Sequence, residues 1–400
     1  MTDTQKLQEP TGLKAPEQAT AVLVLADGTV YYGLGAGAAG EAVGEVCFNT
    51  AMTGHQEILA DPSYAGQIVC FTFPHVGNVG ANADDEEAAS ERARKAAVGM
   101  VARAPITDQA NWRADERFDE WLAGRGVVAI TGVDTRALTR RIRERGMVMA
   151  IIAHDPDGDF DIEALKRRAA EAPPMEGREL ARDVSSDQSS DWAVAGWDWP
   201  SGYADGPEDG PRVVVLDYGV KANILRRLAA AGARVSLAPG SASAGEILAA
   251  KPDGVVVSNG PGDPAATGDY AVETLRGVIE AGVPVLGICL GHQMLALALG
   301  ARTQKMAQGH HGANHPVKNH ETGQVEIVSM NHGFAVDRDS LPPDAVETHV
   351  SLFDGTNCGF KLKDSPVMSV QHHPEASPGP QDSFNVFDRF VASLKTAPEA

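Results

Sequence analysis

The stretch from 284 to 300, PVLGICLGHQMLALALG, constrains the fold more than any other part of this chain. Residues 284–288 form a short apolar run bounded by turn signals, which is typical of a buried parallel strand. Residues 293–299 are apolar nearly all round, as in a covered helix, and Gly300 suits the position that ends such a helix. A buried strand that passes directly into a buried helix indicates a sheet covered by helices.

Cys289 lies at the turn between this strand and helix, flanked by Gly287 and Gly291. The pattern is the cysteine form of a nucleophile elbow, in which a strained turn lifts the reactive side chain above the sheet edge. A helix N-terminus favours the thiolate, and the backbone N–H of Leu290 would point toward a developing oxyanion. An isolated cysteine is more often a packing residue. Here the glycines and the strand-to-helix context favour a nucleophile.

Composition narrows the class of protein. The chain has 400 residues, enough for two or three domains, and its formal net charge of −20 argues against nucleic-acid and anionic-membrane partners. No apolar run approaches the roughly 18 residues that span a bilayer, and residues 1–18 lack a signal-peptide core and read as a flexible tail. The four cysteines fit no zinc or disulfide spacing. We therefore expect a cytoplasmic enzyme.

Residues 19–154 are expected to form a strand-rich α+β domain without a catalytic constellation of its own. An Asp-Gly turn at 27–28 predicts a hairpin. The expected strands are 21–25, 29–32, 45–49, 67–72, 126–131 and 147–153, and the expected helices are 84–96 and the segment that Asp134 caps. Residues 35–40, GAGAAG, match a dinucleotide-binding fingerprint formally, but a strand follows them, so we interpret them as a glycine loop between strands.

Residues 155–210 differ in composition from their surroundings. They contain 15 Asp or Glu against 5 Lys or Arg, a net charge of −10 that is half of the whole chain's. Several prolines, serines and glycines accompany these charges. We expect an acidic linker with one weak helix at 162–170, tethered in part by Trp192, Trp197 and Trp199.

Residues 211–397 alternate regularly between expected strands and helices. The expected strands include 213–216, 234–237, 254–258 and 284–288, and the expected helices include 222–231, 244–250, 270–281 and 382–394. This alternation predicts an α/β domain with a doubly wound, mostly parallel sheet, whose ligands bind beyond the carboxyl ends of the strands. Cys289 lies at such an end.

A thiolate nucleophile needs a base, and the base needs an orienting group. His372-His373-Pro374-Glu375 follows the expected strand at 367–371. Pro374 favours an extended conformation at His373, and in an extended chain residues two apart face the same side. We therefore expect Glu375 to reach His373, and His372 to point away.

Two further motifs are weaker. Gly260 and Gly262, in NGPGDP after another apolar strand, could bring a second backbone N–H to an oxyanion, although such strings mostly form turns. His310, His311 and His315 are clustered, but no acidic or thiolate ligand accompanies them at metal spacing, so we disfavour a metal site.

Several motifs together resemble a known family. GICLGHQ, SNGPGDP and HPEASPGP resemble class I glutamine amidotransferase domains, in which a cysteine takes the side-chain acyl group of glutamine and releases ammonia. NTAMTGHQEILADPSYAGQ, FPHVGNVGAN, GHHGANHPVKN and NHGFAVD resemble, more narrowly, the small-subunit family of carbamoyl-phosphate synthetases. The resemblance covers residues 21–153 and 211–394.

The resemblance implies a role for each matching residue. Cys289 would be the nucleophile, His373 the general acid and base, and Glu375 its orienting group. The implied glutamine-binding residues are Ala51, Gly260, Gly262, Leu290, Gln293, Asn331, Gly333 and Phe334, with the backbone of Leu290 and Gly262 as the oxyanion hole. The family motif NTSMTG has serine where this chain has Ala51. We therefore expect a hydroxyl contact to be lost or replaced, and, where the loss is uncompensated, a lower glutamine KM on Ala51→Ser.

The implied reaction is hydrolysis of L-glutamine through a γ-glutamyl thioester. The resemblance also implies a tunnel that delivers ammonia to a large subunit, which uses ATP, Mg and bicarbonate to make carbamoyl phosphate for arginine and pyrimidine synthesis. This chain has no phosphate-binding-loop motif, and we expect no cofactor and no metal on it. Two alternatives remain, an amidotransferase subunit of another synthase and a non-catalytic regulatory subunit.

Overall fold

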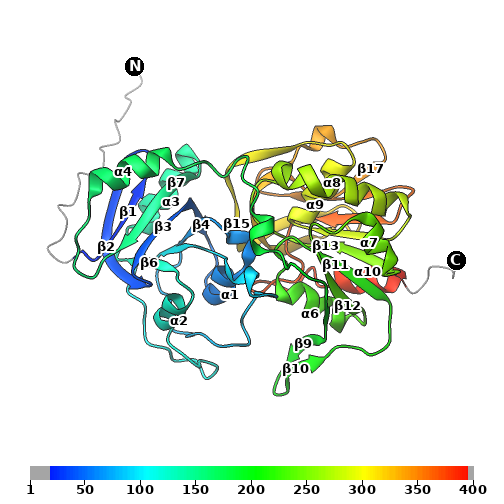
Figure 1. Cartoon of the computed structure of the whole chain (residues 1–400), viewed down its shortest axis with the longest axis horizontal. Helices are drawn as coiled ribbons and strands as arrows, with labels where there is room; N and C mark the ends of the chain where they lie inside the picture. The colour runs from blue at the N-terminus through cyan, green and yellow to red at the C-terminus, as the bar shows by residue number, and fades with distance from the viewer. Residues whose placement is uncertain (1–18, 395–400) are drawn as a thin grey trace.

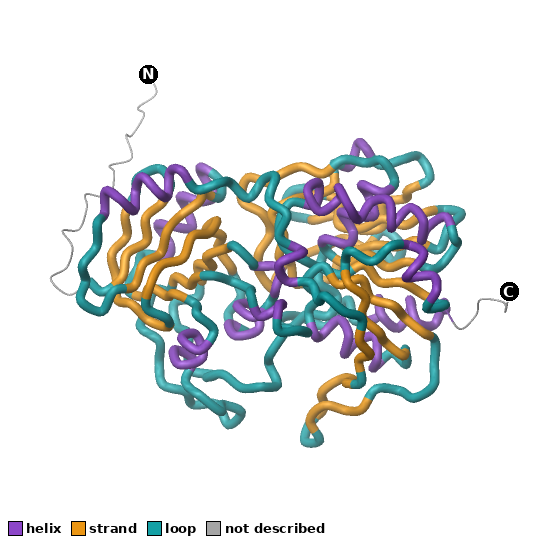
Figure 2. Tube along the Cα trace, viewed as in Figure 1, coloured by secondary structure: helices purple, strands orange, loops and turns teal. Residues whose placement is uncertain are grey.

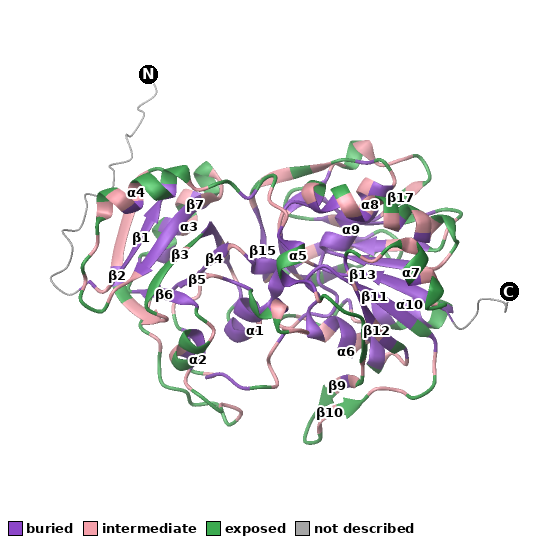
Figure 3. Ribbon diagram, in the orientation of Figure 1, coloured by how far each residue is buried: buried purple, intermediate pink, exposed green. Residues whose placement is uncertain are grey.

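The computed structural model describes residues 19–394 and shows two domains side by side (Figure 1). The tail expected at residues 1–18 lies outside the described residues. Central strands of both domains are buried, as Figure 3 shows. Among the helices of residues 19–394, none is both long and apolar enough to cross a membrane.

The N-terminal domain is a closed seven-stranded barrel. Its strands are β1 (Ala21–Leu25), β2 (Val30–Gly37), β3 (Gly40–Asn49), β4 (Gln67–Phe71), β5 (Gly99–Val101), β6 (Val128–Thr131) and β7 (Val148–His154), in the order β1-β2-β6-β5-β4-β3-β7. Its helices are α1 (His55–Ala60), α2 (Phe118–Gly124) and α3 (Thr135–Arg145), with a short 3-10 helix, η1 (Pro62–Tyr64). The expected hairpin is confirmed, since Val24 of β1 pairs with Val30 of β2. The helix cap is confirmed too, because Asp134 accepts a hydrogen bond from the Ala137 N–H at 3.1 Å.

Two expectations for this domain need correction. The helix expected at 84–96 is wrong, because only a 3-10 turn, η2 (Arg92–Arg94), forms there. The carbonyl and carboxylate of Glu87 instead accept hydrogen bonds from Ala222 and Asn223 of the second domain. The rejected dinucleotide fingerprint does not open a helix, as expected, but most of it is strand rather than loop, since Gly37 ends β2 and Gly40 begins β3.

The segment 155–210 is folded, so a linker is the wrong description for most of it. The expected helix is confirmed as α4 (Ile162–Glu171), which packs Leu165 and Ala169 against β1 and β7. The remaining elements are α5 (Ala181–Val184), β8 (Ser190–Trp192), β9 (Val194–Asp198) and β10 (Gly202–Asp205). The tryptophan tether is also present, because the indole N–H of Trp197 donates to Asp84 of the first domain at 3.2 Å. The acidic composition did not indicate these contacts, because they join residues that are far apart in the sequence.

The C-terminal domain is built on a ten-stranded sheet that also takes in β8. The further strands are β11 (Arg212–Asp217), β12 (Arg234–Pro239), β13 (Gly254–Val257), β14 (Val285–Ile288), β15 (Thr303–Asn319), β16 (Val325–Val336), β17 (Ala345–Ser351), β18 (Asn357–Leu362) and β19 (Val367–Val370). Their order is β16-β15-β17-β18-β19-β14-β13-β11-β12-β8, and β19, β14, β13, β11 and β12 run parallel. This parallel core confirms the doubly wound sheet.

Helices cover both faces of that core (Figure 2). They are α6 (Ala222–Ala230), α7 (Ala244–Ala249), α8 (Pro264–Glu280), α9 (Leu290–Ala298) and α10 (Asn385–Leu394). Leu275 of α8 and Met294 of α9 belong to one core cluster, whereas Leu225 of α6 and Phe387 of α10 belong to the other. Helix α8 begins six residues earlier than the sequence indicated, because Asp263 caps it and proline suits its first turn.

The long strands β15 and β16 reach the N-terminal domain. The hydroxyl of Thr50 donates to Asn314 of β15 at 2.9 Å, and Lys305 of β15 forms an ion pair with Glu45 of β3 at 2.8 Å. The carboxyl end of the parallel core is thereby placed against the barrel.

Candidate active site

The elbow has the strained backbone that its sequence indicated. Cys289 lies between β14 and α9 with φ 54° and ψ −104°, a conformation rare for a residue with a side chain. A Cβ at Gly291 would lie 2.0 Å from the carbonyl oxygen of Val257, and one at Gly287 would lie 2.7 Å from that of Gly291. Both glycines are therefore needed for the strand and helix to pass this closely.

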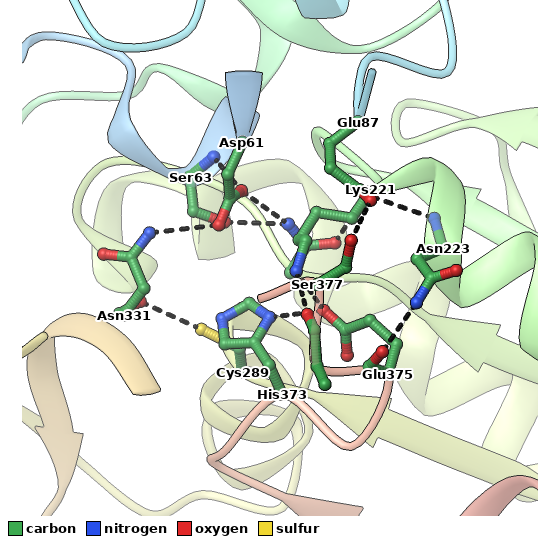
Figure 4. Close-up of polar contacts among 12 residues, drawn as sticks. Asp61, Ser63, Glu87, Lys221, Asn223, Cys289, Asn331, His373, Glu375 and Ser377 are labelled. Atoms are coloured by element: carbon green, nitrogen blue, oxygen red, sulfur yellow. Dashed lines mark hydrogen bonds and ion pairs between the residues drawn. The ribbon is translucent and has the colours of Figure 1, made fainter. Parts of the chain in front are cut away.

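The thiol of Cys289 is buried, with 2% of the residue exposed. Its Sγ atom lies 3.5 Å from the carbonyl oxygen of Asn331 (Figure 4). Within residues 19–394, the backbone N–H groups of Leu290 and Gly262 donate no hydrogen bond. They remain available as the two oxyanion donors that the sequence suggested.

His373 and Glu375 meet as expected. The Nδ1 atom of His373 lies 2.7 Å from Oε1 of Glu375, and both side chains are buried. This bond leaves Nε2 of His373 for the thiol, which lies beside the ring in Figure 4. Burial lowers the pKa of His373, but the charges of Glu375 and Cys289 outweigh burial and raise this pKa well above 6.5. The imidazolium form of His373 is thus favoured.

His372 points away from this pair, as the extended geometry predicts. Its ring packs edge-on against His349, with 5.5 Å between the ring centroids. Neither of its ring nitrogens has a hydrogen-bond partner among the described residues. Burial lowers the pKa of His372 well below its usual value, so this ring is neutral.

Lys221 is a site residue that sequence reasoning missed. Its Nζ atom lies 3.0 Å from Oε1 of Glu375 and donates to the carbonyl of Ala376 at 2.5 Å. Burial would raise the pKa of Glu375, but Lys221 and His373 hold it at about 2. One feature of the sequence could have indicated Lys221. It is the N-cap of α6, a position where a positive charge is unfavourable.

The N-terminal domain also supports the segment that carries Glu375. The side-chain amide of Asn223 donates to the backbone carbonyl of Glu375 at 2.6 Å, while the N–H of Asn223 donates to Glu87 at 3.0 Å. Glu87 is fully buried and accepts a second hydrogen bond from the hydroxyl of Ser377 at 2.5 Å (Figure 4). A first-domain residue therefore fixes the loop that carries Glu375.

A first cavity opens at Cys289, with this residue in its wall. Six residues that the resemblance implied line it, namely Gly260, Gly262, Gln293, Asn331, Gly333 and Phe334. Its other lining residues are Ser63, Gln67, Met175, Pro261, Lys305 and His332. The side-chain amide of Gln293 donates to the carbonyl of Phe334 at 2.7 Å, which fixes both residues at the wall. Leu290 does not line this cavity, so we expect it to contribute only its backbone N–H, as an oxyanion donor.

Ala51 is the one implied residue that lies elsewhere. It lines a second cavity, of about 280 Å³, together with His373, Lys221 and Ser377. The N–H of Ala51 donates to the side chain of Asn49 at 2.8 Å, and Ala51 is not among the residues that line the first cavity. The prediction that the residue at 51 contacts glutamine is therefore corrected, and so is the lower KM expected of Ala51→Ser.

Ser63 takes the place that was expected of position 51. It belongs to η1, which Asp61 caps, and its hydroxyl accepts a hydrogen bond from the side chain of Asn259 at 2.7 Å. No residue of the described chain accepts a hydrogen bond from the Ser63 hydroxyl, so its proton can be donated to a ligand in the first cavity. The residues DPSY were within a motif that the sequence singled out, but the motif alone did not show which side chain faces Cys289.

Ser63→Ala is expected to raise the glutamine KM about two- to tenfold, the value of one hydrogen bond of about 0.5–1.5 kcal/mol, with little change in kcat. Steady-state kinetics of glutamate release measure both constants. Ala51→Ser serves as the matched control and should leave KM unchanged. A wild-type KM in Ser63→Ala, or a lower KM in Ala51→Ser, would contradict this placement.

The histidine cluster at 310–315 does not form a metal centre among residues 19–394, where no group of three or more candidate ligands converges. Nε2 of His310 instead lies 2.9 Å from the carboxylate of Asp354, and Nδ1 of His311 lies 2.9 Å from the side-chain oxygen of Asn331. These histidines contact residues of the cavity wall, but they are not part of the His373–Glu375 pair.

Comparisons with known proteins agree with this arrangement. Residues 214–393 match the family model "Glutamine amidotransferase class-I", and residues 23–152 match "Carbamoyl-phosphate synthase small chain, CPSase domain". The chain is 73% identical to the carbamoyl phosphate synthase small chain of Maricaulis maris, over 94% of this chain and 97% of the relative. It is 62% identical to that of Mesorhizobium japonicum, over 95% and 96%, and 61% identical to that of Caulobacter vibrioides, over 94% and 97%.

Proposed function

Because this chain belongs to the carbamoyl phosphate synthase small-chain family and is its glutamine-hydrolysing component, we propose that L-glutamine binds in the first cavity with its amide carbon at Cys289. The observation that carries this proposal is the strained elbow, which holds a buried thiol beside the His373–Glu375 pair. Gln293, Ser63 and the backbone around Gly333 would hold the amino-acid end of the substrate.

The chemistry follows from the contacts of three side chains. The thiolate of Cys289 attacks the amide carbon, and the oxyanion receives hydrogen bonds from the N–H groups of Leu290 and Gly262. The imidazolium of His373 then gives its proton to the leaving nitrogen, which departs as ammonia. Neutral His373 next takes a proton from water, which attacks the γ-glutamyl thioester and releases glutamate.

The partner is proposed to be the large subunit of the synthase, where ATP, Mg and bicarbonate would be used to make carbamoyl phosphate. Ammonia would become protonated in bulk water, so a covered route is required. The second cavity supports such a route, because its wall includes His373 together with Ala51, Ala313 and Pro378. A cytoplasmic location is also proposed, since all four cysteines are free and buried.

The thioester itself provides the test of this mechanism. We expect acid quenching during turnover, followed by peptide mass spectrometry, to find a γ-glutamyl group on the peptide that contains Cys289. Cys289→Ser should show no such thioester. A glutamyl group attached to another residue, with Cys289 unmodified, would contradict the proposed nucleophile.

Lys221→Met is expected to lower kcat by tenfold or more, about 1.4 kcal/mol of barrier, because Glu375 loses the cation that helps keep it ionised. The sign of the pH effect follows from the depressed pKa of Glu375. Without Lys221 this pKa rises, so the acidic limb of the kcat profile should move to higher pH. Lys305→Met, which removes a cation from the cavity wall without touching Glu375, is the control and should leave that limb in place. An unshifted limb in Lys221→Met would contradict this role.

A further inference from the structure

The proposed function leaves one proton behind at each turnover. The balanced reaction is RCONH₂ + H₂O → RCOO⁻ + NH₃ + H⁺, because the carboxylic acid formed from the thioester ionises near neutral pH. If ammonia is to reach a partner without protonation, this proton must leave the cavity by another path. Buried side chains that exchange protons and reach from the cavity to solvent would provide one.

The cavity wall contains one end of such a chain. His332 lines the cavity and is buried. Its Nδ1–H donates to the carbonyl of Phe334 at 2.8 Å, so in the neutral ring Nε2 is the acceptor. That Nε2 has no partner among the described residues, although an unsatisfied buried polar atom is costly.

His310 supplies a second unsatisfied acceptor next to the first. Its ring stands perpendicular to that of His332, with 5.0 Å between the centroids. Its Nε2 bonds to the carboxylate of Asp354 at 2.9 Å, so Nε2 carries the proton of the neutral ring, while Nδ1 has no partner in the described chain. Two adjacent rings therefore each have one free acceptor, an arrangement suited to an additional proton or to a water that donates to both.

The path ends at the surface. The side chain of Asp354 is 40% exposed, whereas that of His310 is only 5% exposed. Partial burial raises the pKa of Asp354, but hydrogen bonds from His310 and Thr356 outweigh burial and hold this pKa below its usual value. Asp354 is thus ionised at neutral pH and would pass an arriving proton quickly to water.

We propose that His332, His310 and Asp354 form a proton relay from the catalytic cavity to solvent. The proton released by the new carboxylic acid binds Nε2 of His332 and passes through a bridging water to Nδ1 of His310. His310 then gives its own Nε2 proton to Asp354, and Asp354 gives it to water. Reorientation of the two rings restores the starting tautomers, and no electron or co-reactant is needed.

The other titratable groups around the relay favour the neutral form of His332. His311 and His315 adjoin His310 and His332, and Lys305 lies near His311. Burial lowers the pKa of His332 well below 6.5, and the neighbouring histidines lower it further. A neutral His332 can accept a proton, and it holds that proton only briefly.

The main test is Asp354→Asn, which keeps an acceptor for His310 but cannot carry a proton. In the complex with the large subunit and at low buffer concentration, we expect kcat for glutamine to fall about tenfold with KM unchanged. Imidazole added at constant pH and ionic strength should restore the rate, because a small buffer can take the proton from His310. Asp337→Asn is the control, since Asp337 bonds Arg302 and no histidine.

His310→Gln gives an independent check, because glutamine can still donate to Asp354 but cannot accept and release a proton in one step. The same buffer-dependent loss of kcat and a larger solvent deuterium effect are expected. Its control is His320→Gln, since His320 pairs with Glu347 outside the cavity wall. Wild-type kcat at low buffer in either relay variant, or a loss that imidazole does not restore, would overturn the relay. Those results would leave the proposed function intact, whereas loss of glutamine turnover in the wild-type complex would contradict the function itself.

Discussion

His373→Asn is expected to lower kcat for glutamine hydrolysis by at least about a thousandfold, since general acid and base catalysis each contribute about 10²–10⁴. The variant loses the proton donor for the leaving nitrogen and the base for the attacking water. It also leaves the buried carboxylate of Glu375 with Lys221 as its remaining cationic partner. Glutamate release by the complex with the large subunit measures the loss.

His372→Asn is the matched control because it changes the adjacent buried histidine. His372 packs against His349 and makes no hydrogen bond among the described residues, so its loss should cost some stability but keep kcat within severalfold of wild type. Thermal unfolding of both variants separates misfolding from lost chemistry. Equal losses of kcat in two equally folded variants would contradict the assignment of His373.

The reactive centre was predictable from sequence because its geometry is local. Gly287, Cys289 and Gly291 lie within five residues. Both glycines are required because the strand and the helix that they join pass too close for a Cβ atom. The His373–Glu375 contact was equally local, since an extended chain places residues two apart on one side. Spacing alone was sufficient in both cases.

The supporting residues were not predictable because they come from distant parts of the chain. Ser63 reaches the first cavity from η1, Glu87 bonds to Ser377 from a loop of the barrel, and Lys221 pairs with Glu375 from the start of α6. The contacts of Ser63 and Glu87 form only when the barrel packs against the C-terminal domain, whereas Lys221 joins two distant segments within that domain. The Ala51 error had the same origin, since a motif identifies a segment but not which of its side chains faces the ligand.

The errors in secondary structure arose where tertiary contacts overrode local signals. The early carboxylates of residues 84–96 suggested a helix N-terminus, yet Glu87 is fully buried against Asn223 and Ser377. The acidic residues of 155–210 suggested a solvated linker, yet Met175 lines the catalytic cavity and the N–H of Gly177 donates to Asp263 at 2.8 Å. In both segments, the many charged residues indicated exposure to solvent, whereas a few buried or bonded residues hold the segment against the rest of the protein.

Cys289→Ser is expected to abolish glutamine-dependent synthesis in the complex. Serine keeps the size and the backbone of the elbow, but a hydroxyl remains protonated near neutral pH, where the thiol can ionise beside the His373 imidazolium. The substitution should leave the fold and the cavity unchanged, so glutamine should still bind. It removes the step that makes ammonia and leaves every ATP-using step on the partner untouched.

The most direct test supplies each nitrogen source in turn to that complex. Wild-type and Cys289→Ser chains are each combined with the large subunit, ATP, Mg and bicarbonate, and carbamoyl phosphate is measured with glutamine or with an ammonium salt. We expect the wild-type complex to use both sources, and the variant to use ammonium at the wild-type rate and glutamine not at all. Glutamine-dependent synthesis at the wild-type rate in the variant would contradict the role of Cys289, and a wild-type complex inactive with both sources would contradict the proposed division of the reaction between two chains.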